Sequence, residues 1–129
     1  MDRQIIESSQ APAAIGPYAQ ANRVGDLIFT SGQLPIDPAT GEFGATTIAG
    51  QTEQSILNLK AVLEEAGSSL ADVIKTTVLL DDINDFAAMN EVYARYFAGD
   101  ALPSRSAFAV DTLPKRALVE IEAIAMVRA

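Results

Sequence analysis

One arginine and two glutamates stand in two segments whose other residues suit buried strands. Arg105 lies in residues 103–110, and Glu120 and Glu122 lie in residues 117–127. Side chains alternate between the two faces of a strand, so Glu120 and Glu122 point to the same side. Because burying an unpaired charge is costly, charges in such strands pair with each other or face a charged ligand. These residues are therefore candidates for binding an anion and for moving protons.

The chain has neither histidine nor cysteine, and this limits the chemistry open to it. Histidine is the most common general base and metal ligand. Cysteine forms disulfides and many zinc sites, so a disulfide framework and a cysteine-based zinc site are excluded. Any acid–base catalysis falls to glutamate, aspartate, tyrosine or lysine.

Composition indicates one folded domain over residues 1–129, with 49% apolar and 20% charged residues. Nine basic and seventeen acidic side chains give a net charge of −8, which repels nucleic acid because the cations are scattered. The N-terminus lacks the apolar stretch of a signal peptide, and no run of about 20 apolar residues could span a membrane. We expect a cytoplasmic protein that binds neither nucleic acid nor a membrane.

Residue patterns predict six strands and two helices. The strands are expected at residues 4–7, 19–24, 27–32, 72–80, 103–110 and 117–127, and the helices at 47–66 and from Asn84 or Asp85 to about Phe97. Gly25 and Asp26 form the turn of a hairpin between the second and third strands. The turn-type residues 111–116 predict a second hairpin between the last two strands.

The order of these elements predicts an α+β domain, with a mixed six-stranded sheet covered by both helices on one face. The other face must meet solvent or a partner. It is too apolar for full exposure, so we expect a homo-oligomer that buries it. On the second helix Asn90 interrupts an apolar stripe, and its amide is expected to face a polar group.

Six short motifs follow one another along the chain: AIGPYAQ at 14–20, TSGQ at 30–33, KTTVLL at 75–80, NDF at 84–86 with Asn90, PSRS at 103–106 and VEIEAIA at 119–125. In these motifs and their order the sequence resembles the reactive intermediate deaminase family, RidA, also called YjgF. The resemblance runs from about residue 11 to the C-terminus.

The resemblance implies a chorismate-mutase-like fold assembled as a homotrimer, with three equivalent sites in the clefts between subunits. The family's characteristic activity is hydrolysis of enamine and imine intermediates, such as 2-aminoacrylate and 2-iminopropanoate, to a 2-oxo acid and ammonia. It implies no cofactor and no metal.

The family's functional residues carry over to matching positions here. Arg105 corresponds to the arginine that binds the substrate carboxylate, and Glu120 to the glutamate that activates water. We expect partial burial to raise the pKa of Glu120. At the position where RidA proteins usually have cysteine this chain has alanine, which can substitute if the backbone makes the contact. The further substrate-binding positions are Tyr18, Ser31, Asn90 and Ala107.

Several alternatives stay open at this stage. Arg105 and Glu120 could form a structural ion pair at a subunit interface, and Glu122 is expected to be structural. The trimer could also be a non-catalytic regulator that binds small carboxylates, or a chaperone-like protein that protects partners. Ribonuclease activity is disfavoured by the net charge of −8 and the lack of histidine. Chorismate mutase activity is disfavoured because no second cation falls in a motif.

Overall fold

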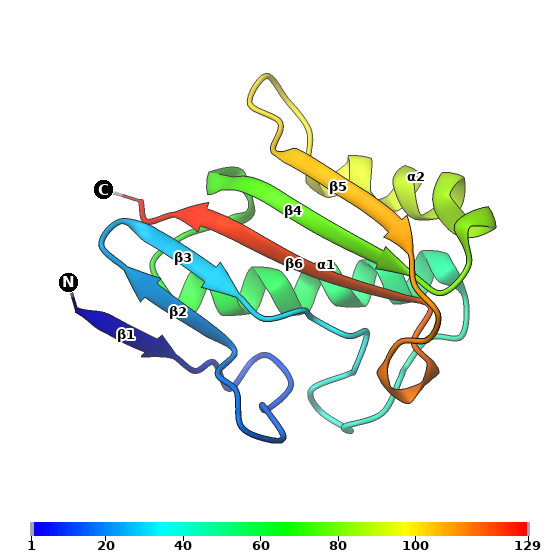
Figure 1. Ribbon diagram of the computed structural model, residues 1–129, viewed down its shortest axis with the longest axis horizontal. Coiled ribbons are helices and arrows are strands. Elements are labelled where there is room, and N and C mark those ends of the chain that lie inside the picture. The colour runs from blue at the N-terminus through cyan, green and yellow to red at the C-terminus, as the bar shows by residue number, and fades with distance from the viewer. Residues whose placement is uncertain (1, 129) are drawn as a thin grey trace.

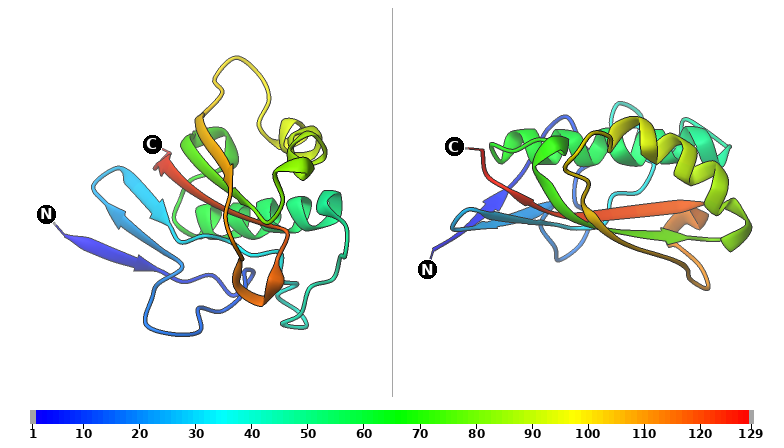
Figure 2. Two further views of the ribbon diagram at one scale, coloured as in Figure 1. Left: turned by 45° about the vertical axis from the view of Figure 1, so that its right-hand side comes forward. Right: turned by 90° about the horizontal axis from the view of Figure 1, so that it is seen from above.

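Two helices cover one face of a six-stranded sheet in the computed structural model of this chain, which describes residues 2–128 (Figures 1 and 2). The sheet has the strand order β1-β2-β3-β6-β4-β5. This confirms the predicted α+β class and layering. The strands are β1 (Arg3–Ile6), β2 (Ala21–Val24), β3 (Leu27–Thr30), β4 (Val73–Leu80), β5 (Ser104–Ala109) and β6 (Val119–Met126), and the helices are α1 (Ile48–Glu65) and α2 (Phe86–Tyr96).

The last two strands do not form the predicted hairpin. β6 lies between β3 and β4 and is antiparallel to both, whereas β5 pairs in parallel with β4 at the edge of the sheet. The turn-type residues between β5 and β6 suggested a local connection, but they instead carry the chain past β4. Every second residue of β6 is buried, which suits a central strand, while β5 has no fully buried residue and suits an edge.

Helix α1 lies close to its predicted bounds and packs on the middle of the sheet. The Thr47 hydroxyl accepts a hydrogen bond from the Gly50 N–H at 3.1 Å and caps the N-terminus. Gly67 follows the helix with φ +83°, as expected of a glycine that closes a helix. Within residues 2–128, neither helix is long and apolar enough to cross a membrane. The largest fully buried side chains include Ile56, Leu59, Leu63, Val78, Leu80 and Ile121.

Helix α2 connects the parallel strands β4 and β5 and begins with a short 3₁₀ turn (Ile83–Asp85). Asp85 occupies the N-cap position, but its side chain accepts no capping hydrogen bond. Asp82 takes over this task, because its carboxylate accepts from the Asn84 N–H at 2.9 Å. The helix therefore begins where the sequence places it, with Asp85 at the N-cap position, although the side-chain capping bond comes from Asp82 and belongs to the preceding 3₁₀ turn.

The pairing of β3 with β6 is interrupted by a bulge of one residue. Phe29 lies opposite Ile124, but Gln33 lies opposite Ile121, so one extra residue is inserted at Ser31 and Gly32. Such bulges bend a strand and redirect nearby side chains. The regular strand ends at Thr30, two residues before the predicted end, and the bulge places Gly32 against the Glu120 side chain.

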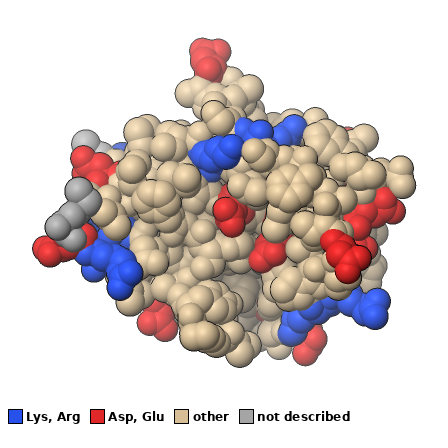
Figure 3. Space-filling view, in the orientation of Figure 1, with Lys and Arg blue, Asp and Glu red and all other residues tan. Residues whose placement is uncertain are grey.

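The sheet face opposite the helices is apolar, as predicted. Strand alternation places Glu120 and Glu122 on this face, because the intervening residues of β6 are buried beneath the helices. Figure 3 shows the face from the side where the strands lie in front, with a largely uncharged surface and a few charged groups. Its large exposed apolar side chains include Ile5, Leu27, Phe29, Phe108 and Met126.

Candidate functional site

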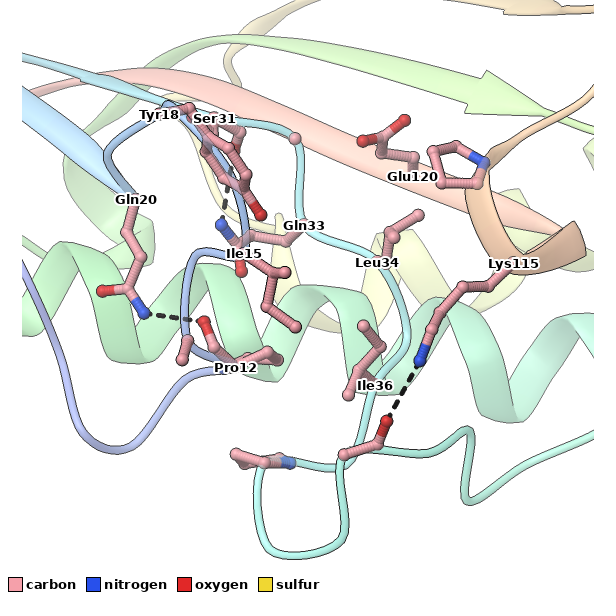
Figure 4. Close-up of a pocket in the computed structure, with 15 residues that line it drawn as sticks. Pro12, Ile15, Tyr18, Gln20, Ser31, Gln33, Leu34, Ile36, Lys115 and Glu120 are labelled. Carbon is pink, nitrogen blue, oxygen red and sulfur yellow. Dashed lines mark hydrogen bonds between the residues drawn. The ribbon is translucent and has the colours of Figure 1, made fainter.

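A cleft of about 640 Å³ opens beside the bulge (Figure 4). It is lined by the loop that precedes β2, by Ser31 and Gly32, by residues 33–41, by the turn at Pro114 and Lys115, and by Glu120. Three of the predicted site residues, Tyr18, Ser31 and Glu120, therefore line one cleft.

The loop before β2 holds Tyr18 at the mouth of the cleft. Gly16 has φ +117°, a backbone conformation that residues other than glycine rarely adopt. Its carbonyl accepts a hydrogen bond from the Tyr18 N–H at 2.9 Å. The buried Gln20 side chain ties the loop down by donating to the Pro12 carbonyl at 2.8 Å. Tyr18 itself is 53% exposed, so its hydroxyl can reach a bound molecule.

The Ser31 hydroxyl already donates a hydrogen bond to the backbone of the neighbouring loop. It donates to the Ala19 carbonyl at 2.6 Å, while the Ser31 N–H donates to the Gln20 carbonyl at 2.8 Å. These two bonds fix the bulge against the loop that carries Tyr18. In this arrangement the hydroxyl oxygen can accept a hydrogen bond from a ligand but has no proton left to give.

Glu120 is half-buried on the cleft wall and makes no hydrogen bond or ion pair with the residues described. Burial raises its pKa, and the negative charge of Glu122 on the same strand face raises it further. The expected direction of this shift is confirmed. A Cβ on Gly32 would lie 2.7 Å from Cδ and 2.8 Å from Cγ of Glu120, so only glycine leaves room for this carboxyl group.

Arg105 and Asn90 form a second group on the helix-covered side of the sheet. The Arg105 Nη1 donates to the Asn90 Oδ1 at 2.6 Å, which confirms that the Asn90 amide faces a polar group. The guanidinium carbon lies 5.3 Å from the Phe86 ring centre and 4.8 Å from that of Tyr93, within cation–π range. The Tyr93 hydroxyl is anchored by the buried Thr76 hydroxyl at 2.7 Å. Arg105 is thus held in place with most of its donors still available.

The two groups do not meet within one chain. Arg105 lies on the side of α2, whereas Glu120 lines the cleft on the opposite side of the sheet. Among the residues described, Arg105 and Glu120 form no ion pair. Ala107 follows Arg105 on the same face of β5 and packs partly buried against the core.

Sequence reasoning missed several residues of the cleft. Lys115 lines it with φ +57°, and the next residue, Arg116, has φ +58°. Two successive non-glycine residues in this conformation leave no mark in composition or periodicity. Leu34 and Ile36 also line the cleft, but they lie in a segment whose turn signals predicted only a loop.

Related proteins match nearly the whole chain. A family model described as endoribonuclease L-PSP matches residues 8–127. A RutC family protein of Pyrococcus abyssi is 55% identical, over 97% of this chain and 98% of that protein. A 2-iminobutanoate/2-iminopropanoate deaminase of Rattus norvegicus is 48% identical, over 96% of this chain and 90% of that protein. The crystal structure of E. coli TdcF with bound serine has a TM-score of 0.90 at 47% identity, covering 98% of this chain and 99% of that chain.

The variant Gly32→Ala should drive the Glu120 carboxyl group out of the cleft, because the new methyl group overlaps the side chain from Cγ onward. Greater exposure should then lower the pKa of Glu120 toward its ordinary value. A carbon-13 NMR titration of the Glu120 carboxyl group measures this. Gly44→Ala is the matched control, since its Cβ would meet only Asp37 at 3.8 Å. An unchanged Glu120 pKa in Gly32→Ala would contradict the steric argument.

The variant Glu122→Gln should also lower the pKa of Glu120, because it removes the neighbouring negative charge that disfavours ionisation. The pKa should remain above its ordinary value, since burial, the larger cause, is unchanged. The same titration measures the shift, with the exposed Glu91→Gln as control. If the pKa of Glu120 does not fall in Glu122→Gln, the charge of Glu122 does not contribute to raising it.

Proposed function

Because this chain belongs to the RidA/YjgF family, which the endoribonuclease L-PSP model describes, we propose that it hydrolyses reactive 2-enamine and 2-imino acids to 2-oxo acids and ammonia. Substrates of this class include 2-aminoacrylate and its tautomer 2-iminopropanoate. The name of the rat relative supports the activity. The observation that carries the proposal is the half-buried carboxyl group of Glu120, which has a raised pKa and lies in a cleft large enough for a small acid.

Arg105 is the proposed anchor for the substrate carboxylate. Its planar guanidinium can bind both carboxylate oxygens at once, which a lysine ammonium cannot do. The bond to Asn90 and the rings of Phe86 and Tyr93 already orient it, so little ordering is needed when the substrate binds. Asn90 therefore acts mainly through Arg105. The backbone at Ala107 is the proposed second contact.

Glu120 is the proposed general base and acid. Its carboxylate takes a proton from a water molecule while the water oxygen bonds to C2, and the C2=N electron pair moves to nitrogen. The resulting carboxylic acid returns the proton to nitrogen. In the protonated imine this leaves an ammonium group on C2 and a regenerated Glu120 carboxylate. The carboxylate takes the hydroxyl proton as the oxygen forms the C2=O bond, and the electron pair of the broken C2–N bond leaves with ammonia. A raised pKa suits both roles, because it makes the carboxylate a stronger base and brings its pKa closer to neutral pH, where both forms of the group are accessible. Tyr18 and Ser31 would orient the reactants by hydrogen bonding.

A second copy of the chain is needed to complete this site. Arg105 and Glu120 lie on opposite sides of the sheet, so we propose that each site takes Glu120 from one subunit and Arg105 from the next. Three subunits related by a threefold axis would give three such sites. Burial of the apolar sheet face would stabilise this homotrimer.

An endoribonuclease activity, which the family description names, fits this chain less well. The net charge is −8, and binding an RNA backbone requires clustered cations. The cleft contains one lysine and one glutamate among its ionisable groups other than Tyr18. A small carboxylic acid matches these features better than a polyanion.

The protein should accelerate release of pyruvate from the imino acid that an amino acid oxidase generates from alanine. Arg105→Lys and Glu120→Gln should each lower kcat/KM by roughly 100-fold or more, because they remove bidentate binding and proton transfer. Glu91→Gln, at an exposed position on α2 away from the cleft, should keep most of the activity. Coupled detection of the 2-oxo acid measures the rate. A wild-type rate equal to that of buffer would refute the proposed function.

Mixed oligomers should test the shared site. Arg105→Ala and Glu120→Gln subunits, each inactive alone, should regain activity when unfolded together and refolded in equal amounts. Random assembly would leave about one quarter of the sites with both residues intact if they come from different subunits. If both residues served from the same subunit, every site would lack one of them. The absence of recovered activity in correctly assembled mixtures would rule out the shared site.

A further inference from the structure

Two buried side-chain amides on α1 hold the wall of the cleft. Asn58 is 1% exposed and Gln51 is 4% exposed, and their spacing of seven positions places both on the same face of the helix. This buried face also carries the hydroxyls of Thr52 and Ser55, and its other side chains are apolar and pack against the sheet. Buried amides in such a place are costly unless they find partners, so their partners show what they stabilise.

Asn58 has every donor and its acceptor engaged. Its Nδ2 donates to the Leu34 carbonyl at 2.9 Å and to the Ile36 carbonyl at 2.8 Å, and its Oδ1 accepts from the Gln54 side chain at 2.9 Å. One side-chain amide on α1 therefore holds both backbone carbonyls in place. Their segment has no helix or strand of its own here, apart from isolated bridges at Gln33 and Ile36.

Gln51 makes the equivalent contacts two helical turns earlier. Its Nε2 donates to the Ala45 carbonyl at 3.0 Å, and its Oε1 accepts from the Leu118 N–H at 2.8 Å. Leu118 directly precedes the strand that carries Glu120. The two amides thus tie both ends of residues 34–45, and the start of β6, to one rigid helix.

The segment held by Asn58 presents apolar side chains to the cleft. Leu34 and Ile36 are half-buried and line it, while Pro35 between them is buried. Figure 4 shows Leu34 beside Glu120, and Ile36 facing Ile15 across the cleft. Lys115 lies at the far end, where its Nζ donates to the Gly41 carbonyl at 3.3 Å. On the side formed by Leu34 and Ile36, the space next to Glu120 is therefore bounded by hydrocarbon.

We propose that Leu34 and Ile36 form the subsite for the side chain of the substrate, and that Asn58 is the positioning residue that fixes this subsite. The proposal rests on the imino acid hydrolysis described above and specifies its substrate class. The cleft should prefer 2-imino acids with an apolar side chain longer than a methyl group. It should disfavour 2-imino acids with a charged side chain.

Ile36→Ala tests the subsite with little risk to folding, because the residue is only half-buried. For the imino acid generated from leucine, KM should rise about 10-fold, the usual effect of removing one or two methylene contacts from an apolar pocket. For the imino acid generated from alanine, KM should change less than about twofold, since its methyl group does not reach the wall. Equal changes for both substrates would overturn the subsite.

Asn58→Asp tests the positioning role with almost no change in shape. It removes both donors and sets a carboxylate against two carbonyls. KM for the leucine-derived substrate should rise while kcat is retained, and amide hydrogen exchange in residues 36–45 should become faster. Ser55→Ala is the control, because the Ser55 hydroxyl is buried on the same helix and has no hydrogen-bond partner within residues 2–128. Unchanged exchange and unchanged KM in Asn58→Asp would overturn the role of Asn58.

Equilibrium binding separates failure of this inference from failure of the proposed function. The stable products, pyruvate and 4-methyl-2-oxopentanoate, are titrated into wild type and Ile36→Ala by calorimetry. Tighter binding of the longer acid by wild type, lost in Ile36→Ala, supports the subsite even if no hydrolysis is detected. Hydrolysis without any side-chain preference, in turnover and in binding, leaves the proposed function intact and overturns the subsite.

Discussion

The site depends on the space that a one-residue bulge leaves for a single carboxyl group. A regular pairing of β3 with β6 would bring strand backbone and side chains against Glu120. The extra residue at Ser31 and Gly32 moves the chain aside, and the missing Cβ of Gly32 leaves room for the Glu120 side chain. Because the carboxyl group is half-buried and unpaired there, its pKa rises. Beyond Gln33, which still pairs with Ile121, the chain leaves the sheet, and residues of the segment 34–41 line the cleft.

Strand alternation imposes the second constraint. It places Arg105 on the side of the helices and Glu120 on the open side, so one chain by itself cannot present both to one small molecule. The guanidinium is nevertheless ordered in advance, between Asn90 and the rings of Phe86 and Tyr93. The apolar surface that surrounds Glu120 is the kind of surface that protein association buries. The proposed arrangement, in which neighbouring subunits complete each other's sites, would explain both the separation of Arg105 from Glu120 and the apolar surface of the open sheet face.

The helices contribute polar groups to both parts of the proposed site. On α2, Asn90 orients Arg105, and on α1, Asn58 and Gln51 hold the irregular segments that line the cleft. An irregular loop has backbone carbonyls and N–H groups that no sheet or helix satisfies, and a buried amide can supply what is missing. Rigid elements thereby fix the position of loops that would otherwise adopt many conformations. Thr52 and Ser55 show the contrast, since their buried hydroxyls make no hydrogen bond to any residue that the structure describes.

Sequence by itself determined the element types, the single domain, the apolar open face and the family, because these follow from local periodicity, composition and short motifs. It also identified Glu120 and Arg105 as unusual charges on strands. The pairing of β6 between β3 and β4 was decided only by the tertiary structure, since alternation marks a strand but does not specify its neighbours. The same holds for the bulge at Gly32, for the backbone of Lys115 and for the contacts of Asn58. Each of these depends on which distant segments meet, and that is a property of the packed chain rather than of any stretch of residues.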